Sequence, residues 1–385
     1  MSYLELARGS GLKRGPRVSR ALPASGVVVF AVSLAGLLRL DPLESLWARI
    51  ALAALALLSL TALAAGLVHK CLERGSIPAA KATLLGYGLF STLLIGEIFF
   101  SFIPRSNGNG NALAMRRWMA EYWKPINRFG FRDPDYSASD LERKRKILVV
   151  GDSFVAGHGI KDYRKRFPDL LQAMLPEGCL VVTIAAPGWD SRQELDELER
   201  FPYQPDLVVL GYVGNDIAGA AGSLGKLPRV PQYGGLEGPL QTVVRHSYFL
   251  DFVYWLLPRR DAGWYARALK SLYDDPAVLG AHEADLGKLI EQCRKSQAKL
   301  VVVIFPFLED VAASGFFTRP IDRFFRDHAV PVIEVSTLLD DHPAKDLIIN
   351  SSDAHPSELV HRLVADALYQ FVARGGPCRK PSPLH

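Results

Sequence analysis

The sequence predicts an α/β protein, a three-layer α/β/α sandwich with a parallel sheet, preceded by three transmembrane helices. Two observations lead to this prediction. Long uncharged stretches lie within the first 104 residues, and short continuous runs of Val, Ile and Leu alternate with amphipathic stretches through the rest of the chain. Continuous apolar runs are typical of strands buried on both faces, as in parallel sheets covered by helices.

The uncharged stretches cover residues 21–38, 50–69 and 82–104, and Glu97 is the one charged residue among them. A helix needs about 20 apolar residues to cross a bilayer, so each stretch is a candidate span. The first also fits a signal peptide, but no small-residue cleavage site follows it, and we expect an uncleaved anchor. Glu97 lies near the outer end of the third span, where a carboxyl is either a functional site or packed against another span.

Charge predicts the orientation of these spans. The 385 residues include 45 Lys and Arg against 40 Asp and Glu, and residues 1–104 hold ten basic and five acidic side chains, which is the whole surplus. Basic side chains flank the first span and fill the loop after the second, at Arg8, Lys13, Arg14, Arg17, Arg20, Lys70, Arg74 and Lys81. Basic flanks stay in the cytoplasm. The sequence therefore predicts a multi-pass inner-membrane protein with a cytoplasmic amino terminus.

These observations divide the chain into parts. We expect a basic cytoplasmic tail over residues 1–20, a transmembrane region over 21–104 in contact with bilayer lipid, and a connector over 105–144. Residues 145–385 form the folded domain, on the periplasmic or extracellular side. The chain beyond residue 104 has equal numbers of acidic and basic residues, so nucleic acid is not an expected partner.

Five apolar runs predict the strands of this domain, and they cover residues 147–150, 180–184, 207–210, 300–305 and 332–335. An apolar stripe from Leu359 to Phe371 predicts a final helix. Residues 217–275 interrupt the alternation as an insertion. Its apolar segment, residues 248–257, predicts either a buried helix of the insertion or a lid that leans on the bilayer.

Polar residues follow three of the predicted strands. Ser153 follows Gly151 and Asp152 on the turn after the first strand, Gly188 follows the second, and Asn215 follows the third. Ligands of parallel sheets bind at the carboxyl ends of strands. A serine on such a turn exposes its hydroxyl and has its own N–H at a helix start, where an oxyanion is favoured.

Asp353 and His355 lie in one segment directly before the final helix. A hydroxyl nucleophile needs a base that takes its proton, and an imidazole base needs a carboxylate that fixes its tautomer. These two residues supply both groups, so the sequence predicts nucleophilic catalysis at Ser153.

With these blocks in this order, residues 145–373 resemble the SGNH/GDSL hydrolase superfamily, a group of serine esterases and acyl-modifying enzymes on a flavodoxin-like α/β/α fold. The resemblance implies that Ser153 is the nucleophile, His355 the base and Asp353 the carboxylate that orients it. It also implies an oxyanion hole made by the N–H groups of Ser153 and Gly188 and the side chain of Asn215.

Two positions depart from the family pattern. Val213 stands where the family usually has glycine, and one residue separates Asp353 from His355 where two are common. The shorter spacing occurs among membrane-tethered members, and Asp340 or Asp341 is the alternative carboxylate. Residues 127–133 also resemble a segment that precedes the nucleophile strand in such members.

Other chemistries have no motif in this sequence. Phosphate-loop, dinucleotide-binding and zinc-protease patterns are absent, so no cofactor and no metal is expected. His158, five residues after Ser153, is expected at the pocket. A disulfide between Cys293 and Cys378 stays open, because spacing alone does not decide it.

Together these expectations predict a membrane-anchored, extracytoplasmic serine esterase that cleaves O-acyl esters through an acyl-enzyme on Ser153. Its expected substrate is an acylated glycan or lipid. One alternative is an O-acyltransferase that modifies an envelope polysaccharide with the same triad, which would require a membrane partner as acyl donor. The other is a non-catalytic, membrane-tethered interaction module.

Overall fold

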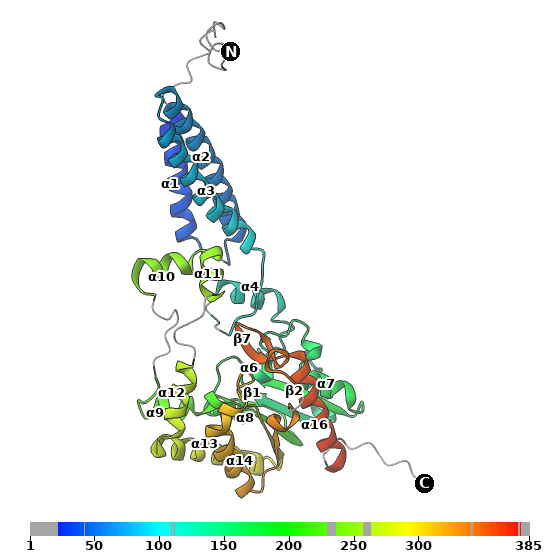
Figure 1. Cartoon of the computed structure of the whole chain (residues 1–385). Helices are drawn as coiled ribbons and strands as arrows, with labels where there is room; N and C mark the ends of the chain where they lie inside the picture. Colours follow the sequence, from blue (N-terminus) through cyan, green and yellow to red (C-terminus); the bar gives the residue numbers. More distant parts are fainter. Residues whose placement is uncertain are drawn as a thin grey trace. The chain divides into compact units, whose positions relative to one another are not determined.

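A computed structural model describes residues 22–41, 43–108, 110, 112–228, 236–256, 263–339, 342–375 and 378 (Figure 1). The chain divides into two compact units. One contains the described residues up to Phe102 together with Thr242–Asp251, and the other contains the described residues of Ile103–Gln241 and those from Phe252 onward.

The first unit is built on three helices, α1 (Leu22–Arg39), α2 (Leu46–Glu73) and α3 (Ile77–Phe100). Among the described residues, α2 and α3 are long and apolar enough to cross a membrane, whereas the apolar part of α1 is shorter. Two of the three predicted spans therefore have the length and composition that crossing a membrane requires, and the prediction of three transmembrane helices is not confirmed. Small residues bring the helices together: Ala53 and Ala56 of α2 are fully buried and pack with Leu37 and Leu94.

Glu97 of α3 is paired with an arginine that the sequence reasoning did not identify. Its Oε1 accepts a hydrogen bond from Nη2 of Arg49 at 2.9 Å, and both side chains are buried. Its Oε2 accepts from the Ser247 hydroxyl at 2.8 Å and from the Phe249 N–H at 3.3 Å. Of the two alternatives for Glu97, the structure favours packing against another span, with a turn of the insertion as a further partner.

In the second unit, and within the described ranges, five strands form one parallel sheet in the order β2-β1-β3-β4-β5. They are β1 (Arg145–Gly151), β2 (Cys179–Ala185), β3 (Leu207–Tyr212), β4 (Lys299–Ile304) and β5 (Val332–Glu334). The predicted α/β fold and its five strands are thus confirmed. Gly151 is in register with Ala185 and with Gly211, so the carboxyl ends of the three strands that precede the polar blocks meet at one edge.

Helices cover both faces of the sheet (Figure 1). Leu148 and Val150 point to one face and pack with α8 (Ser191–Arg200), α12 (Trp264–Tyr273), α13 (Pro276–Lys295) and α14 (Gly315–Asp327). Ile147 and Val149 point to the other and pack with α7 (Phe167–Met174) and α16 (Glu358–Gly375). Successive strand residues therefore pack into two hydrophobic cores, one on each face of the sheet, as continuous apolar runs predict.

Shorter elements complete the two units. They are α4 (Leu113–Tyr122), α5 (Ala138–Arg143), α6 (Ser153–Ala156), α9 (Ala218–Ser223), α10 (Gly238–Arg245), α11 (Tyr248–Leu256), α15 (Ala344–Leu347), β6 (Ile348–Asn350) and β7 (Asp353–Pro356), with parts of α10 and α11 in the first unit. The predicted apolar helix begins at Tyr248 as expected, and Leu257 lies outside the described residues. Tyr248 and Trp255 of α11 are buried and Leu256 is exposed, so a buried helix and a lid both stay open as roles of this helix.

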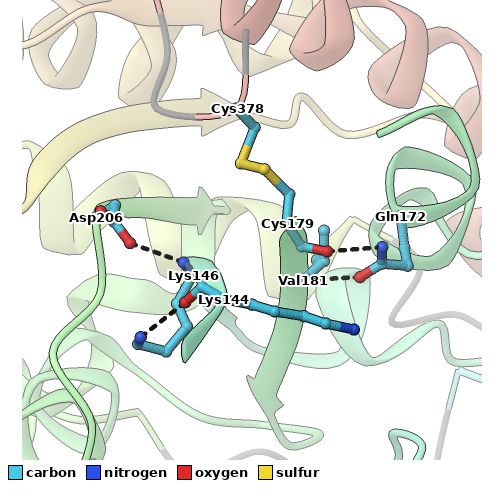
Figure 2. The surroundings of a disulfide bond; sticks show 7 residues. All are labelled: Lys144, Lys146, Gln172, Cys179, Val181, Asp206 and Cys378. Carbon is cyan, nitrogen blue, oxygen red and sulfur yellow. Dashed lines mark hydrogen bonds between the residues drawn. A yellow bond between two sulfur atoms is a disulfide. The ribbon is translucent and has the colours of Figure 1, made fainter. Parts of the chain in front are cut away.

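The disulfide joins Cys179 to Cys378, with 5.9 Å between their Cα atoms, and Figure 2 shows its surroundings. Pairing of Cys293 with Cys378 is therefore wrong. Cys293 lies on α13 in the core on one face of the sheet, whereas Cys378 follows α16 and reaches the start of β2 on the other face. Gln172 of α7 binds the same strand, since its amide contacts the Cys179 carbonyl at 3.3 Å and the Val181 N–H at 2.7 Å (Figure 2).

This disulfide gives a stability prediction. It links two residues that are 199 positions apart. Cys378→Ser should therefore lower the free energy of unfolding by about 2–5 kcal/mol, mainly because the unfolded chain gains conformational entropy when the link is removed. Because Cys179 begins β2, at the sheet edge opposite the polar blocks, the activity of the folded variant at low temperature should match wild type. Thermal unfolding and ester hydrolysis of the purified full chain measure the two effects. Loss of activity without loss of stability would contradict this account.

Candidate active site

Ser153 lies on a tight turn between β1 and α6. Asp152 caps this short helix, since its Oδ1 accepts the N–H of Phe154 at 2.8 Å. The turn requires glycine at its start, because a Cβ on Gly151 would lie 2.3 Å from the Val155 side chain and 2.9 Å from the Gly211 carbonyl oxygen. The strand-turn-helix placement predicted for Ser153 is what the structure shows.

Ser153, His355 and Asp353 form a continuous hydrogen-bonded relay. Oγ of Ser153 lies 2.9 Å from Nε2 of His355, and Nδ1 of His355 lies 2.5 Å from Oδ1 of Asp353. Because the Nδ1–H donates to the carboxylate, Nε2 is left as an acceptor for the serine hydroxyl. This arrangement can take the proton from Ser153 as its oxygen attacks a substrate.

The one-residue spacing between Asp353 and His355 has a structural reason. Both lie on β7, which pairs antiparallel with β6. Residues two apart on a strand point to the same side, so a single spacer brings the carboxylate under the imidazole. The alternatives Asp340 and Asp341 lie outside the described residues.

Asp353 is ionised at neutral pH. Burial favours its neutral form, but the hydrogen bond and charge of His355, with smaller effects of His158 and Ser106, lower the pKa of Asp353 to about 2. Its carboxylate therefore stays charged and can stabilise an imidazolium formed on His355.

Gly188 and Asn215 line the same cavity as Ser153. Gly188 has a φ of 79°, which favours glycine, and Nδ2 of Asn215 donates to Oδ2 of Asp152 at 3.3 Å and to the Trp189 carbonyl at 3.2 Å. Val213 is tolerated in place of glycine because its φ of −139° is ordinary extended backbone.

All three predicted oxyanion residues border one cavity of about 480 Å³. Its described lining consists of Gly108, Gly110, Met119, Asp152, Ser153, Phe154, His158, Pro187, Gly188, Val213, Asn215, Tyr265, Phe307, Glu309, Ala354 and His355. Apolar and aromatic side chains dominate, and none of these lining residues is Lys or Arg. Asp152 and Glu309 are its carboxyls, so the cavity suits an uncharged acyl group better than an anionic one.

His158 lies behind the catalytic imidazole. Its ring stacks on that of His355 with 4.1 Å between centroids, and its Nε2 is 2.9 Å from the Asn107 carbonyl oxygen. Burial, with the nearby charge of His355, lowers the pKa of His158 to about 4, so its ring is neutral at pH 7. It therefore adds no positive charge against an imidazolium on His355.

His158, Asp353 and His355 are also the one described group whose ligand atoms lie close enough to hold a metal, within 4.8 Å of one another. The two imidazoles are stacked face to face, and Nδ1 of His355 is already 2.5 Å from Asp353. Lone pairs in parallel ring planes do not converge on a tetrahedral centre. The group therefore fits a proton relay better than a metal site.

The segment over residues 127–133 braces the loop that follows α6. The buried guanidinium of Arg132 donates to the carbonyls of Gly157 and Ile160, each at 2.6 Å. Asp133 accepts the N–H of Thr183 on β2 at 3.1 Å. The segment thus joins the nucleophile turn to the sheet, a role that its sequence alone did not establish.

Sequence reasoning missed a buried acidic pair. Glu194 of α8 and Asp216 are fully buried, and neither oxygen of Glu194 has a hydrogen-bond partner within the described part of the chain. Burial and the charge of the neighbouring carboxyls, including Asp152, raise the pKa of both well above the ordinary range. The surroundings of Glu194 therefore favour its neutral form. No sequence signal marked it, because α8 reads as a charged surface helix.

Comparison with known proteins identifies the family. The chain matches the GDSL-like lipase/acylhydrolase family over residues 149–363, more than half of its length, and belongs to that family. It is an ester-hydrolysing enzyme of the SGNH/GDSL type. Among curated proteins, none matches the chain.

Solved structures with a similar fold include a lipase/acylhydrolase from Enterococcus faecalis, at 14% identity and a TM-score of 0.40, covering 62% of this chain and 100% of that one. Another is a member of the lipolytic protein G-D-S-L family from Veillonella parvula, at 13% identity and 0.37, covering 60% and 99%. A third is the psychrotrophic esterase EstA from Pseudoalteromonas sp., at 15% identity and 0.36, covering 60% and 98%.

The buried pair predicts how stability depends on pH. Unfolding exposes Glu194 and restores its ordinary pKa, so above about pH 4.5 the unfolded chain releases a proton that the folded chain keeps, and the folded state loses stability as pH rises. Glu194→Gln removes this loss. Its stability relative to wild type should be greater at pH 8 than at pH 5, with a slope of at most about 1.4 kcal/mol per pH unit.

Denaturant unfolding of the full chain in detergent at the two pH values measures this difference. The exposed Glu199→Gln on the same helix is the control and should show the wild-type dependence. A constant difference between Glu194→Gln and wild type across this range would mean that Glu194 is not held neutral.

Proposed function

We propose that this enzyme is a membrane-anchored serine esterase that acts outside the cytoplasm and cleaves O-acyl esters through an acyl-enzyme on Ser153. The observation that carries the proposal is the relay at the cavity, with Ser153 Oγ 2.9 Å from His355 Nε2 and His355 Nδ1 2.5 Å from Asp353. A serine esterase needs this arrangement beside a substrate pocket.

In the proposed mechanism, Oγ of Ser153 attacks the ester carbonyl carbon while Nε2 of His355 takes its proton. The negative charge that forms on the carbonyl oxygen is held by the N–H groups of Ser153 and Gly188 and by Nδ2 of Asn215. The present hydrogen bonds of Asn215, 3.2–3.3 Å long, are weak enough for the oxyanion to replace one of them.

Collapse of this intermediate breaks the ester bond, and His355 donates its proton to the departing alcohol oxygen. The acyl group is then bonded to Ser153. Water, deprotonated by His355, attacks the acyl carbon in the second half, and the carboxylic acid leaves as the proton returns to Ser153. Asp353 holds the imidazole in the required tautomer throughout.

Two features support a location outside the cytoplasm. The Cys179–Cys378 disulfide fits an oxidising compartment, because cytosolic thiols are kept reduced. The long apolar helices α2 and α3 support anchoring in a membrane, and the basic residues around them favour a cytoplasmic amino terminus. We propose an inner-membrane protein with its catalytic domain in the periplasm or extracellular space.

The proposed substrate is an acyl ester on a glycan or a lipid. Phe154, Phe307 and Tyr265 line the cavity and suit a short apolar acyl chain. With an alcohol in place of water in the second half, the same residues would transfer the acyl group to a polysaccharide, and a membrane partner would have to supply the donor.

The test uses the full chain purified in detergent, with p-nitrophenyl esters of about two to twelve carbons, which span short and long acyl groups. Ser153→Ala and His355→Ala should each lower kcat by about 10⁴-fold or more, and a fluorophosphonate should label wild type at Ser153. Ser351→Ala, an exposed serine before β7, is the control and should leave activity unchanged.

Wild-type chain that neither hydrolyses any ester nor reacts with the fluorophosphonate would contradict the proposed function. If p-nitrophenol is released only when a sugar alcohol is added, the transferase alternative would replace the proposed esterase function.

A further inference from the structure

We propose that the connector between the transmembrane region and the catalytic domain is part of the active site, with Ser106 as a positioning residue that holds Asp353. This inference rests on the proposed function, because it assigns a role in the same relay. The resemblance to the family does not supply it, since residues 105–108 precede both the resembling segment and the matched range.

Ser106 binds the carboxylate oxygen that His355 does not use. Oδ1 of Asp353 accepts from Nδ1 of His355 at 2.5 Å and from its backbone N–H at 3.2 Å. Oδ2 accepts the hydroxyl of Ser106. Asp353 is only 1% exposed, so its carboxylate depends on donors within the protein. A buried charged oxygen that loses its donor is costly, and Ser106 therefore fixes the rotation of the carboxylate.

The connector is itself held against the strands that carry the relay. Nδ2 of Asn350, on β6, donates to the Ser106 carbonyl at 3.1 Å. The Gly108 N–H donates to the Ser352 carbonyl at 2.9 Å. Ser106 and Asn107 are 5% and 6% exposed, although a linker normally runs over the surface. The polar residues of the connector are thus buried and hydrogen-bonded, which is typical of residues that form part of a functional site.

The residue after Ser106 contacts the other side of the relay. The Asn107 carbonyl accepts the Nε2–H of His158 at 2.9 Å, and the ring of His158 stacks on His355 at 4.1 Å. His158 also stacks on Trp118 of α4 with 6.2 Å between centroids. Two adjacent connector residues therefore orient the carboxylate and the ring that packs against the base.

This arrangement predicts which kinetic constant depends on Ser106. Ser106 is not among the described residues that line the substrate cavity, so its loss should leave KM unchanged. A carboxylate free to rotate should hold His355 less well for proton transfer, and kcat should fall. Because Ser106 acts through Asp353, its loss should have no effect once Asp353 cannot act.

The experiment uses the full chain in detergent, with p-nitrophenyl acetate hydrolysis and the rate of fluorophosphonate labelling at Ser153 as separate readouts. Ser106→Ala should lower kcat and the labelling rate by about 10- to 100-fold, the loss expected for one hydrogen bond to a buried charge. Ser106→Thr keeps the hydroxyl and should restore both rates. Ser351→Ala, which removes an exposed neighbouring hydroxyl outside the relay, should match wild type.

A double-mutant cycle separates positioning from folding. Ser106→Ala should cause no further loss in an Asp353→Asn background, and thermal unfolding should show that each variant is folded. Wild-type rates in Ser106→Ala, or an equal loss in both backgrounds, would overturn the role of Ser106 and leave the proposed function standing. If the fluorophosphonate does not label the wild-type chain, both the role of Ser106 and the proposed function would be overturned.

Discussion

The parallel pairing of β1 with β2 and β3 is the constraint on which the site depends. Gly151 is in register with Ala185 and with Gly211, so three turns that are far apart in sequence begin at the same edge of the sheet. The absence of a side chain at Gly151 lets the nucleophile turn fit beside Val155 and the β3 backbone. Ser153, Gly188 and Asn215 then reach one cavity without long loops. The fold thereby prepares the geometry before a substrate arrives.

Buried charge is the second organising feature. Hydrogen-bond donors and the charge of His355 lower the pKa of Asp353, whereas burial and the charge of neighbouring carboxyls raise the pKa values of Glu194 and Asp216. The surroundings of carboxyls in one domain thus shift their pKa values in opposite directions. His158, neutral and stacked on His355, adds no positive charge of its own behind the base.

Much of the fold and of the site followed from sequence. The apolar runs predicted the five strands because strands buried on both faces leave a simple pattern, and the polar blocks were informative because they follow those strands. The features that the sequence did not predict depend on packing across the domain. Cys179 and Cys293 are both buried in strand or helix patterns, and only the placement of α16 shows which of them Cys378 can reach. Glu194 is buried on a helix whose other residues are mostly charged, and Ser106 lies in what reads as a polar linker.

The central claim is that Ser153 carries the acyl group between ester and water. Rapid-quench mass spectrometry tests it most directly: the full chain would be mixed with a p-nitrophenyl ester, acid-quenched within milliseconds to seconds, digested and mapped. The account predicts a peptide that contains Ser153 and is heavier by the mass of the acyl group, appearing before steady state and absent in Ser153→Ala. Hydrolysis with no adduct on Ser153, or with the acyl group on another residue, would contradict it.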